Sequence, residues 1–81
     1  MKTKKWTNGE WTIKAYNTGN PENFLNTRVE VFHGQGKFET CPLIATTEKE
    51  IYDHQKKDER FFIIMPNHVM EKAREMLRNI K

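Results

Sequence analysis

The sequence predicts an α+β fold. We expect a small mixed or antiparallel sheet built from two β-hairpins plus a buried central strand, one short helix, and a C-terminal amphipathic helix packed on one face. Turn residues at Asn8-Gly9 and Gly34-Gln35-Gly36 predict the hairpins. Apolar residues at helical spacing predict the last helix. At 81 residues, the chain holds only a small core, so residues 1–81 are expected to form a single domain.

The first hairpin is predicted at Asn8-Gly9. A type I′ turn needs positive φ at both central residues, and Asn-Gly between strand-type residues satisfies this need. A two-residue loop there would place Thr7 opposite Glu10. Trp6 would then oppose Trp11 at the next position, so we expect both indoles on one face of the hairpin.

Strand alternation continues through residues 10–16 and 27–33. Trp11, Ile13 and Ala15 are predicted to share one face of the first strand, and Val29 and Val31 are predicted to point inward in the second. Between these strands, the Asn-rich segment Asn17–Asn26 is predicted to be a loop whose Phe24 and Leu25 tuck against the core. Residues 37–41 should pair with 27–33, and Pro42 makes that strand an edge strand or ends it.

Two helices and one strand are expected in the second half. Thr47 and Glu50 match a capping box, which predicts a short helix from there to about Lys57. The apolar run Phe61–Met65 predicts a buried strand, with the helix as a parallel crossover if the preceding strand lies in the same sheet. Asn67 is expected to be the N-cap of the last helix. Its apolar stripe is Val69, Met70, Ala73, Met76, Leu77 and Ile80.

Composition limits the possible partners and compartments. The net charge is +3, and the basic residues concentrate toward the two ends of the chain. No apolar run approaches the roughly 20 residues that span a bilayer, so we expect no membrane partner. A secretory signal has an apolar segment after its basic residues, and none follows Lys2, Lys4 and Lys5. We therefore expect no secretory signal here. The single cysteine, Cys41, allows no intramolecular disulfide, which favours a reducing cytoplasmic setting.

No pattern typical of an enzyme is found. His33, Cys41, His54 and His68 are irregularly spaced, so we expect no metal site and no cofactor. Nothing near Cys41 in sequence lowers its pKa, and a strand cysteine is expected to be buried and inert. Gly34-Gln35-Gly36-Lys37 lacks the spacing of a phosphate-binding loop.

Protein binding is the function class that we predict first. Residues with A/T-rich codons (Phe, Tyr, Met, Ile, Asn and Lys) total 34, against 14 for Gly, Ala, Arg and Pro. This bias is typical of phages and mobile elements, whose small proteins commonly block a larger host protein. We therefore predict a small non-enzymatic binding protein that regulates or inhibits a protein partner. The expected contact residues are Trp6, Trp11, Tyr16, Phe24 and Leu25.

Nucleic-acid binding is the alternative. Lysines lie next to aromatic residues in the N-terminal hairpin, a combination that suits phosphate neutralisation and base stacking on a single strand. The residues expected to contact phosphates are Lys4, Lys5 and Lys14. Against this alternative, the basic character is modest for a dedicated nucleic-acid module.

Overall fold

The computed structural model describes residues 1–20, 22, 25–56 and 65–81. Its four strands form one antiparallel sheet in the order β1-β2-β3-β4. The elements are β1 (Lys2–Thr7), β2 (Trp11–Asn17), β3 (Thr27–His33), the short 3₁₀ helix η1 (Gly36–Phe38), β4 (Thr40–Ala45), α1 (Glu48–Lys56) and α2 (Asn67–Ile80).

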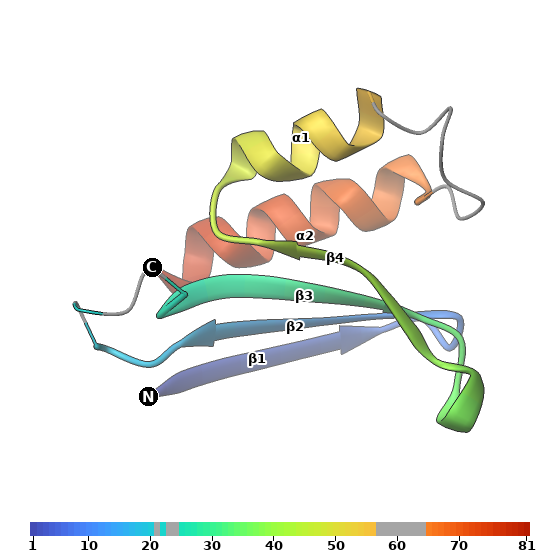
Figure 1. Cartoon of the computed structure of the whole chain (residues 1–81), viewed down its shortest axis with the longest axis horizontal. Helices are drawn as coiled ribbons and strands as arrows, with labels where there is room; N and C mark the ends of the chain where they lie inside the picture. Colours follow the sequence, from blue (N-terminus) through green and yellow to red (C-terminus); the bar gives the residue numbers. More distant parts are fainter. Residues whose placement is uncertain (21, 23–24, 57–64) are drawn as a thin grey trace.

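Both helices lie on the same side of the sheet (Figure 1). Helix α2 runs along the sheet and contacts β1, β2 and β3, whereas α1 packs against α2 and β4. The predicted α+β fold is thereby confirmed. The other face of the sheet is covered by no helix among the residues that the structure describes.

The first turn differs from its prediction. Trp6 pairs with Ile13 rather than with Trp11, and Thr7 pairs with Thr12 rather than with Glu10. Asn8 causes the difference, because its Oδ1 accepts the backbone N–H of Glu10 (3.0 Å) and that of Trp11 (2.8 Å). Gly9 alone adopts positive φ in this turn, at 97°, so a type I′ turn centred on Asn8-Gly9 is wrong.

The register shift preserves the predicted faces. The pairing moves by two residues, and side chains in a strand repeat with a period of two. Trp11 therefore stays on the inward face beside Ile13, and Trp6 packs partly buried against the same core. The two indoles lie on one side of the sheet, as predicted, although they are not directly paired.

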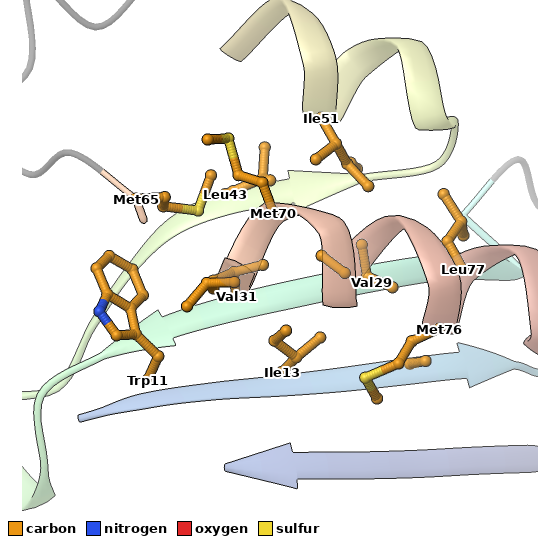
Figure 2. Packing of buried hydrophobic residues seen from close by; sticks show 14 of the residues in the cluster. Trp11, Ile13, Val29, Val31, Leu43, Ile51, Met65, Met70, Met76 and Leu77 are labelled. Carbon is orange, nitrogen blue, oxygen red and sulfur yellow. The ribbon is translucent and has the colours of Figure 1, made fainter. Parts of the chain in front are cut away.

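The core lies between the sheet and α2 (Figure 2). Side chains of β2 and β3 meet the apolar stripe of α2, and Ile51 of α1 and Met65 close one side. The buried residues are Trp11, Ile13, Ala15, Val29, Val31, Leu43, Ala45, Ile51, Met65, Val69, Met70, Ala73, Met76, Leu77 and Ile80. This list contains the predicted inward residues Val29 and Val31, the three residues predicted to share one face of β2, and the whole predicted stripe of the last helix.

The second hairpin is confirmed with changed limits. Lys37 and Phe38 lie in η1 rather than in a strand, and β4 begins at Thr40. Pro42 lies within β4 instead of ending it. The β3–β4 register shifts between Val31 and His33, and this bulge accommodates a proline that cannot donate to the ladder.

Of the two predicted helix N-caps, the one of α1 is confirmed and the one of α2 is wrong. The Glu50 N–H donates to Thr47 Oγ1 (3.2 Å), which confirms Thr47 as the N-cap of α1. Asn67 is the first residue of α2, not its N-cap. The N-cap is Pro66, whose carbonyl accepts the N–H groups of Val69 (3.0 Å) and Met70 (3.1 Å). The predicted helix end at Lys57 and residues 61–64 of the predicted strand lie outside the described residues. The parallel crossover that this strand would complete is therefore not tested. Met65 is described, buried and not in a strand.

Two polar contacts hold the C-terminal end of α2. The Asn17 side-chain amide at the end of β2 donates to the Ile80 carbonyl (2.9 Å), which belongs to the last turn of α2. Arg78 of α2 donates to Glu48 of α1 (2.7 Å). This hydrogen bond lowers the pKa of the Glu48 carboxyl, and the positive charges of Arg78 and Arg74 act in the same direction. The two contacts link α2 to the sheet and to α1.

We predict that Gly34→Ala destabilises the fold more than Gly19→Ala. Both glycines have positive φ, 93° and 76°, which costs an alanine about 1–2 kcal/mol. A Cβ at Gly34 would also lie 2.9 Å from the Phe38 carbonyl oxygen, whereas at Gly19 it would meet nothing within 4 Å. Urea denaturation of the two variants checks this; equal midpoints would contradict the close approach at Gly34.

Leu77→Ala is expected to lower the free energy of unfolding by about 2–5 kcal/mol, because the side chain is fully buried and its removal leaves a cavity. Asn79→Ala, two residues on at an exposed position of α2, should stay within about 0.5 kcal/mol. Denaturation curves for both variants compare the two faces of the helix. Similar losses would contradict the assignment of the buried face.

Candidate functional site

The face of the sheet that points away from the helices is polar, cationic and partly aromatic. Its members follow from strand alternation, because their neighbours in β2, β3 and β4 point into the core and the β1 members pair with the outward residues of β2. We call it the open face: Thr3, Lys5, Thr7, Thr12, Lys14, Tyr16, Arg28, Glu30, Phe32 and Ile44. Its basic residues outnumber its single acidic residue, so this face attracts anions.

A hollow of about 400 Å³ lies across β1 and β2, mostly on this face. We call it the lysine hollow, and it is lined by Thr3, Lys4, Lys5, Lys14 and Tyr16. The structure thus brings together all three lysines named for the nucleic-acid alternative. It also places Tyr16, the aromatic residue of the same strand, beside them.

The lysine hollow has an unfavourable charge arrangement. Lys5 lies directly opposite Lys14 in the β1–β2 register, where like charges destabilise a sheet. Within the described parts of the chain, no carboxylate forms an ion pair with Lys4, Lys5 or Lys14. Glu30 lies opposite Lys14 on the β3 side, but it accepts a hydrogen bond from Arg28 instead (3.0 Å).

Two aromatic rings on the open face lie next to cations. The Arg28 guanidinium carbon is 4.4 Å from the centre of the Tyr16 ring, and Lys14 Nζ is 5.0 Å from that of Phe32. Arg28 is also held by the Leu25 carbonyl, which accepts from its Nη1 (3.0 Å). Cations and aromatic rings therefore lie next to each other over β2 and β3. A ligand that has both negative charge and flat rings could contact both kinds of group.

The residues named for protein binding are scattered. Trp11 is only 3% exposed and stacks on His33 with ring centres 4.3 Å apart, so its indole offers almost no surface to a partner. Trp6 is half-buried on the helix side of β1, and Leu25 is half-buried beside Arg28. Phe24 lies outside the described residues. Of the described members of the set, only Tyr16 belongs to the open face.

A second hollow, of about 250 Å³, lies on the other side of β1, between that strand and α2. We call it the α2-side hollow, and it is lined by Lys4, Lys5, Trp6, Lys72, Glu75, Met76 and Asn79. Sequence reasoning missed Lys72 here, because helical periodicity places it outside the apolar stripe without indicating which strand it approaches. It also left Phe32 unassigned, although its alternation with Val29 and Val31 places it on the open face.

The thiol and imidazole groups do not form a site. Cys41 is exposed, so its predicted burial is wrong; it lies in the outer strand β4 next to the bulge. Partial burial of its sulfur still raises the pKa of the thiol, with Glu30 and Glu39 acting in the same direction, which disfavours a reactive thiolate. His33 pairs with Glu10 (3.0 Å). Among the described residues, no three His, Cys, Asp or Glu side chains are grouped closely enough to hold a metal ion.

A hollow of about 190 Å³ between α1 and α2 is less suited to an anion. Ile51, Tyr52, Asn67, Met70, Glu71 and Arg74 line it, so its formal charges cancel.

No family model, curated protein or solved structure matches the chain. Neither α1 nor α2 is long and apolar enough to cross a membrane. The lysine hollow and the open face are therefore the candidate site.

We predict that Lys5→Gln leaves the melting temperature unchanged or raises it. The substitution removes repulsion from Lys14 and, in the described structure, breaks no ion pair. Any gain should be larger at low salt, where charges are less screened. Glu30→Gln, the comparison variant, should lower the melting temperature because it weakens the bond to half-buried Arg28. Thermal melts at two salt concentrations test this, and a salt-sensitive loss for Lys5→Gln would refute repulsion at the hollow.

Proposed function

We propose that this protein binds single-stranded nucleic acid on the open face of its sheet. The observation that supports this most directly is the lysine hollow. Three lysines without a carboxylate partner among the described residues surround Tyr16, and two of them directly oppose each other. A polyanion would relieve this repulsion, so the arrangement is unfavourable for stability alone and favourable for binding phosphate.

The open face offers both contacts that a single strand needs. Lys4, Lys5 and Lys14 would neutralise backbone phosphates, while unpaired bases stack near Tyr16 and Phe32. Arg28, already stacked on Tyr16, adds a planar cation on which a base also stacks. A double helix hides its base faces, so these rings favour a single strand over a duplex.

Binding is expected to tolerate many sequences. Base edges are commonly read by bidentate Asn, Gln or Arg side chains. The open face as defined here contains no Asn or Gln, and its Arg28 is engaged by Glu30 and the Leu25 carbonyl. Stacking and phosphate contacts remain, and neither distinguishes strongly among bases. The proposal assigns no catalytic step to the chain.

A protein partner, regulated or inhibited by this chain, is the second candidate. Two exposed apolar side chains near β4 support it: Phe38 of η1 is 77% exposed and Ile44 is 53% exposed. Large exposed apolar groups are typical of protein contacts. β4 lies at the opposite edge of the sheet from the lysine hollow. Phe38 also lies outside the open face, so its substitution can test this candidate separately from the first.

Replacing Lys4, Lys5 and Lys14 by Gln is expected to abolish tight binding of a fluorescent oligothymidine near physiological salt. For the wild-type protein, the logarithm of affinity should fall linearly with the logarithm of salt concentration. The triple variant should make that slope shallower by about 2, at roughly 0.7 for each phosphate contact. Fluorescence anisotropy titrations at several salt concentrations measure both quantities.

A triple variant of equal net charge controls for nonspecific attraction. Lys37, Lys49 and Lys81 are exposed residues outside the lysine hollow, and replacing all three by Gln should change the affinity far less. Equal losses in the two triple variants would show that only net charge matters. Absence of binding by the wild-type protein would overturn the proposal and favour the protein-partner candidate. Phe38→Ser, at an exposed position outside the open face, should leave oligothymidine binding intact.

A further inference from the structure

We infer that a bound single strand crosses β1 and continues into the α2-side hollow, where Trp6 forms a second base-stacking subsite. This inference rests on the proposed function and extends it. It assigns a nucleotide-binding role to a tryptophan that the fold alone would explain as core packing. The ligand class is the same, single-stranded nucleic acid, and the new element is the path that it takes.

The two hollows meet at β1. Lys4 and Lys5 line both of them, so the lysine hollow and the α2-side hollow share these two residues of β1. Strand β1 is one of the two outer strands of the described sheet, and five of its six residues are exposed. Successive residues of a strand point to opposite faces, which places Lys5 on the open face and Lys4 on the helix side. A single-stranded nucleic acid bound at Lys5 can therefore pass over the edge of the sheet and reach Lys4.

Trp6 is suitably placed for stacking. It is the half-buried residue of β1, it packs against the core on one side, and it also lines the α2-side hollow. A core contact on one side holds the indole in place, so little side-chain entropy remains to be lost on binding. Trp11, by contrast, is enclosed in the core and cannot reach a ligand.

The charges of the α2-side hollow favour phosphate overall, with one opposing group. Lys4, Lys5 and Lys72 contribute positive charge, and Glu75 contributes negative charge. Glu75 accepts a hydrogen bond from Lys72 (3.4 Å), and its side chain is 54% exposed. A phosphate entering this hollow would compete with Glu75 for Lys72. Glu75 therefore weakens binding there, and its removal should strengthen binding.

The length of the oligonucleotide separates the two subsites. An oligothymidine of about 4 nucleotides should fill the lysine hollow alone, whereas one of about 12 should also reach Trp6. We expect Trp6→Leu, which keeps an apolar side chain against the core, to weaken binding of the longer oligonucleotide by about 10-fold. Binding of the shorter one should change by less than about 2-fold. Anisotropy titrations of both lengths provide the comparison, and circular dichroism checks the fold.

Two charge variants test the same path without touching the core. Lys72→Gln should weaken binding of the longer oligonucleotide only, and Glu75→Gln should strengthen it. Lys49→Gln and Glu71→Gln make the same charge changes at exposed helix positions outside both hollows, and they should have little effect. These variants keep the inference testable if Trp6→Leu fails to fold.

The outcomes distinguish this inference from the proposed function. If the Lys4, Lys5 and Lys14 variant loses binding but the Trp6, Lys72 and Glu75 variants match the wild-type protein at both lengths, the second subsite is wrong and the proposed function stands. If the wild-type protein binds neither oligonucleotide, both are wrong. A length-dependent loss in Trp6→Leu and Lys72→Gln, with a gain in Glu75→Gln, supports the path over β1.

Discussion

The packing of α2 against one face of the sheet is the contact on which the rest of the structure depends. In a chain of 81 residues, a single layer of helix over sheet is the main way to bury enough apolar surface. The α2 stripe meets inward residues of β2 and β3, with Ile51 of α1 closing one side (Figure 2). Both helices lie on this side (Figure 1). The other face of the described sheet therefore keeps its cations and rings uncovered by either helix.

Strand alternation connects this core to the candidate site. Each residue that enters the core from β2 or β3 fixes a neighbour on the open face, so Ile13 and Ala15 place Lys14 and Tyr16 outward. The antiparallel register then places Lys5 opposite Lys14. Local rules favour opposite charges at such a position. A departure from a local rule on the face that the core leaves free is the kind of conflict that functional sites commonly contain.

The hairpin at Asn8 shows how one side chain changes a register. Asn-Gly favours a type I′ turn, and that preference predicts a direct Trp6–Trp11 pair. In the structure, Asn8 Oδ1 accepts hydrogen bonds from the backbone N–H groups of Glu10 and Trp11, which a backbone carbonyl would otherwise accept. The pairing of β1 with β2 moves by two residues. Trp6 then lies opposite Ile13 and next to α2, where it lines a hollow, instead of covering Trp11. The composition of both hollows depends on this shift.

The sequence by itself determined the α+β class, the alternating faces of β2 and β3, the capped start of α1 and the apolar stripe of α2. These follow from periodicity and capping, which act over a few residues. It did not determine the register at Trp6, the exposure of Cys41 or the meeting of Lys72 with Lys4 and Lys5. Only the tertiary structure decided these, because each depends on how a turn side chain, a bulge or a helix face is placed against a distant strand. Local propensity contains no information about that placement.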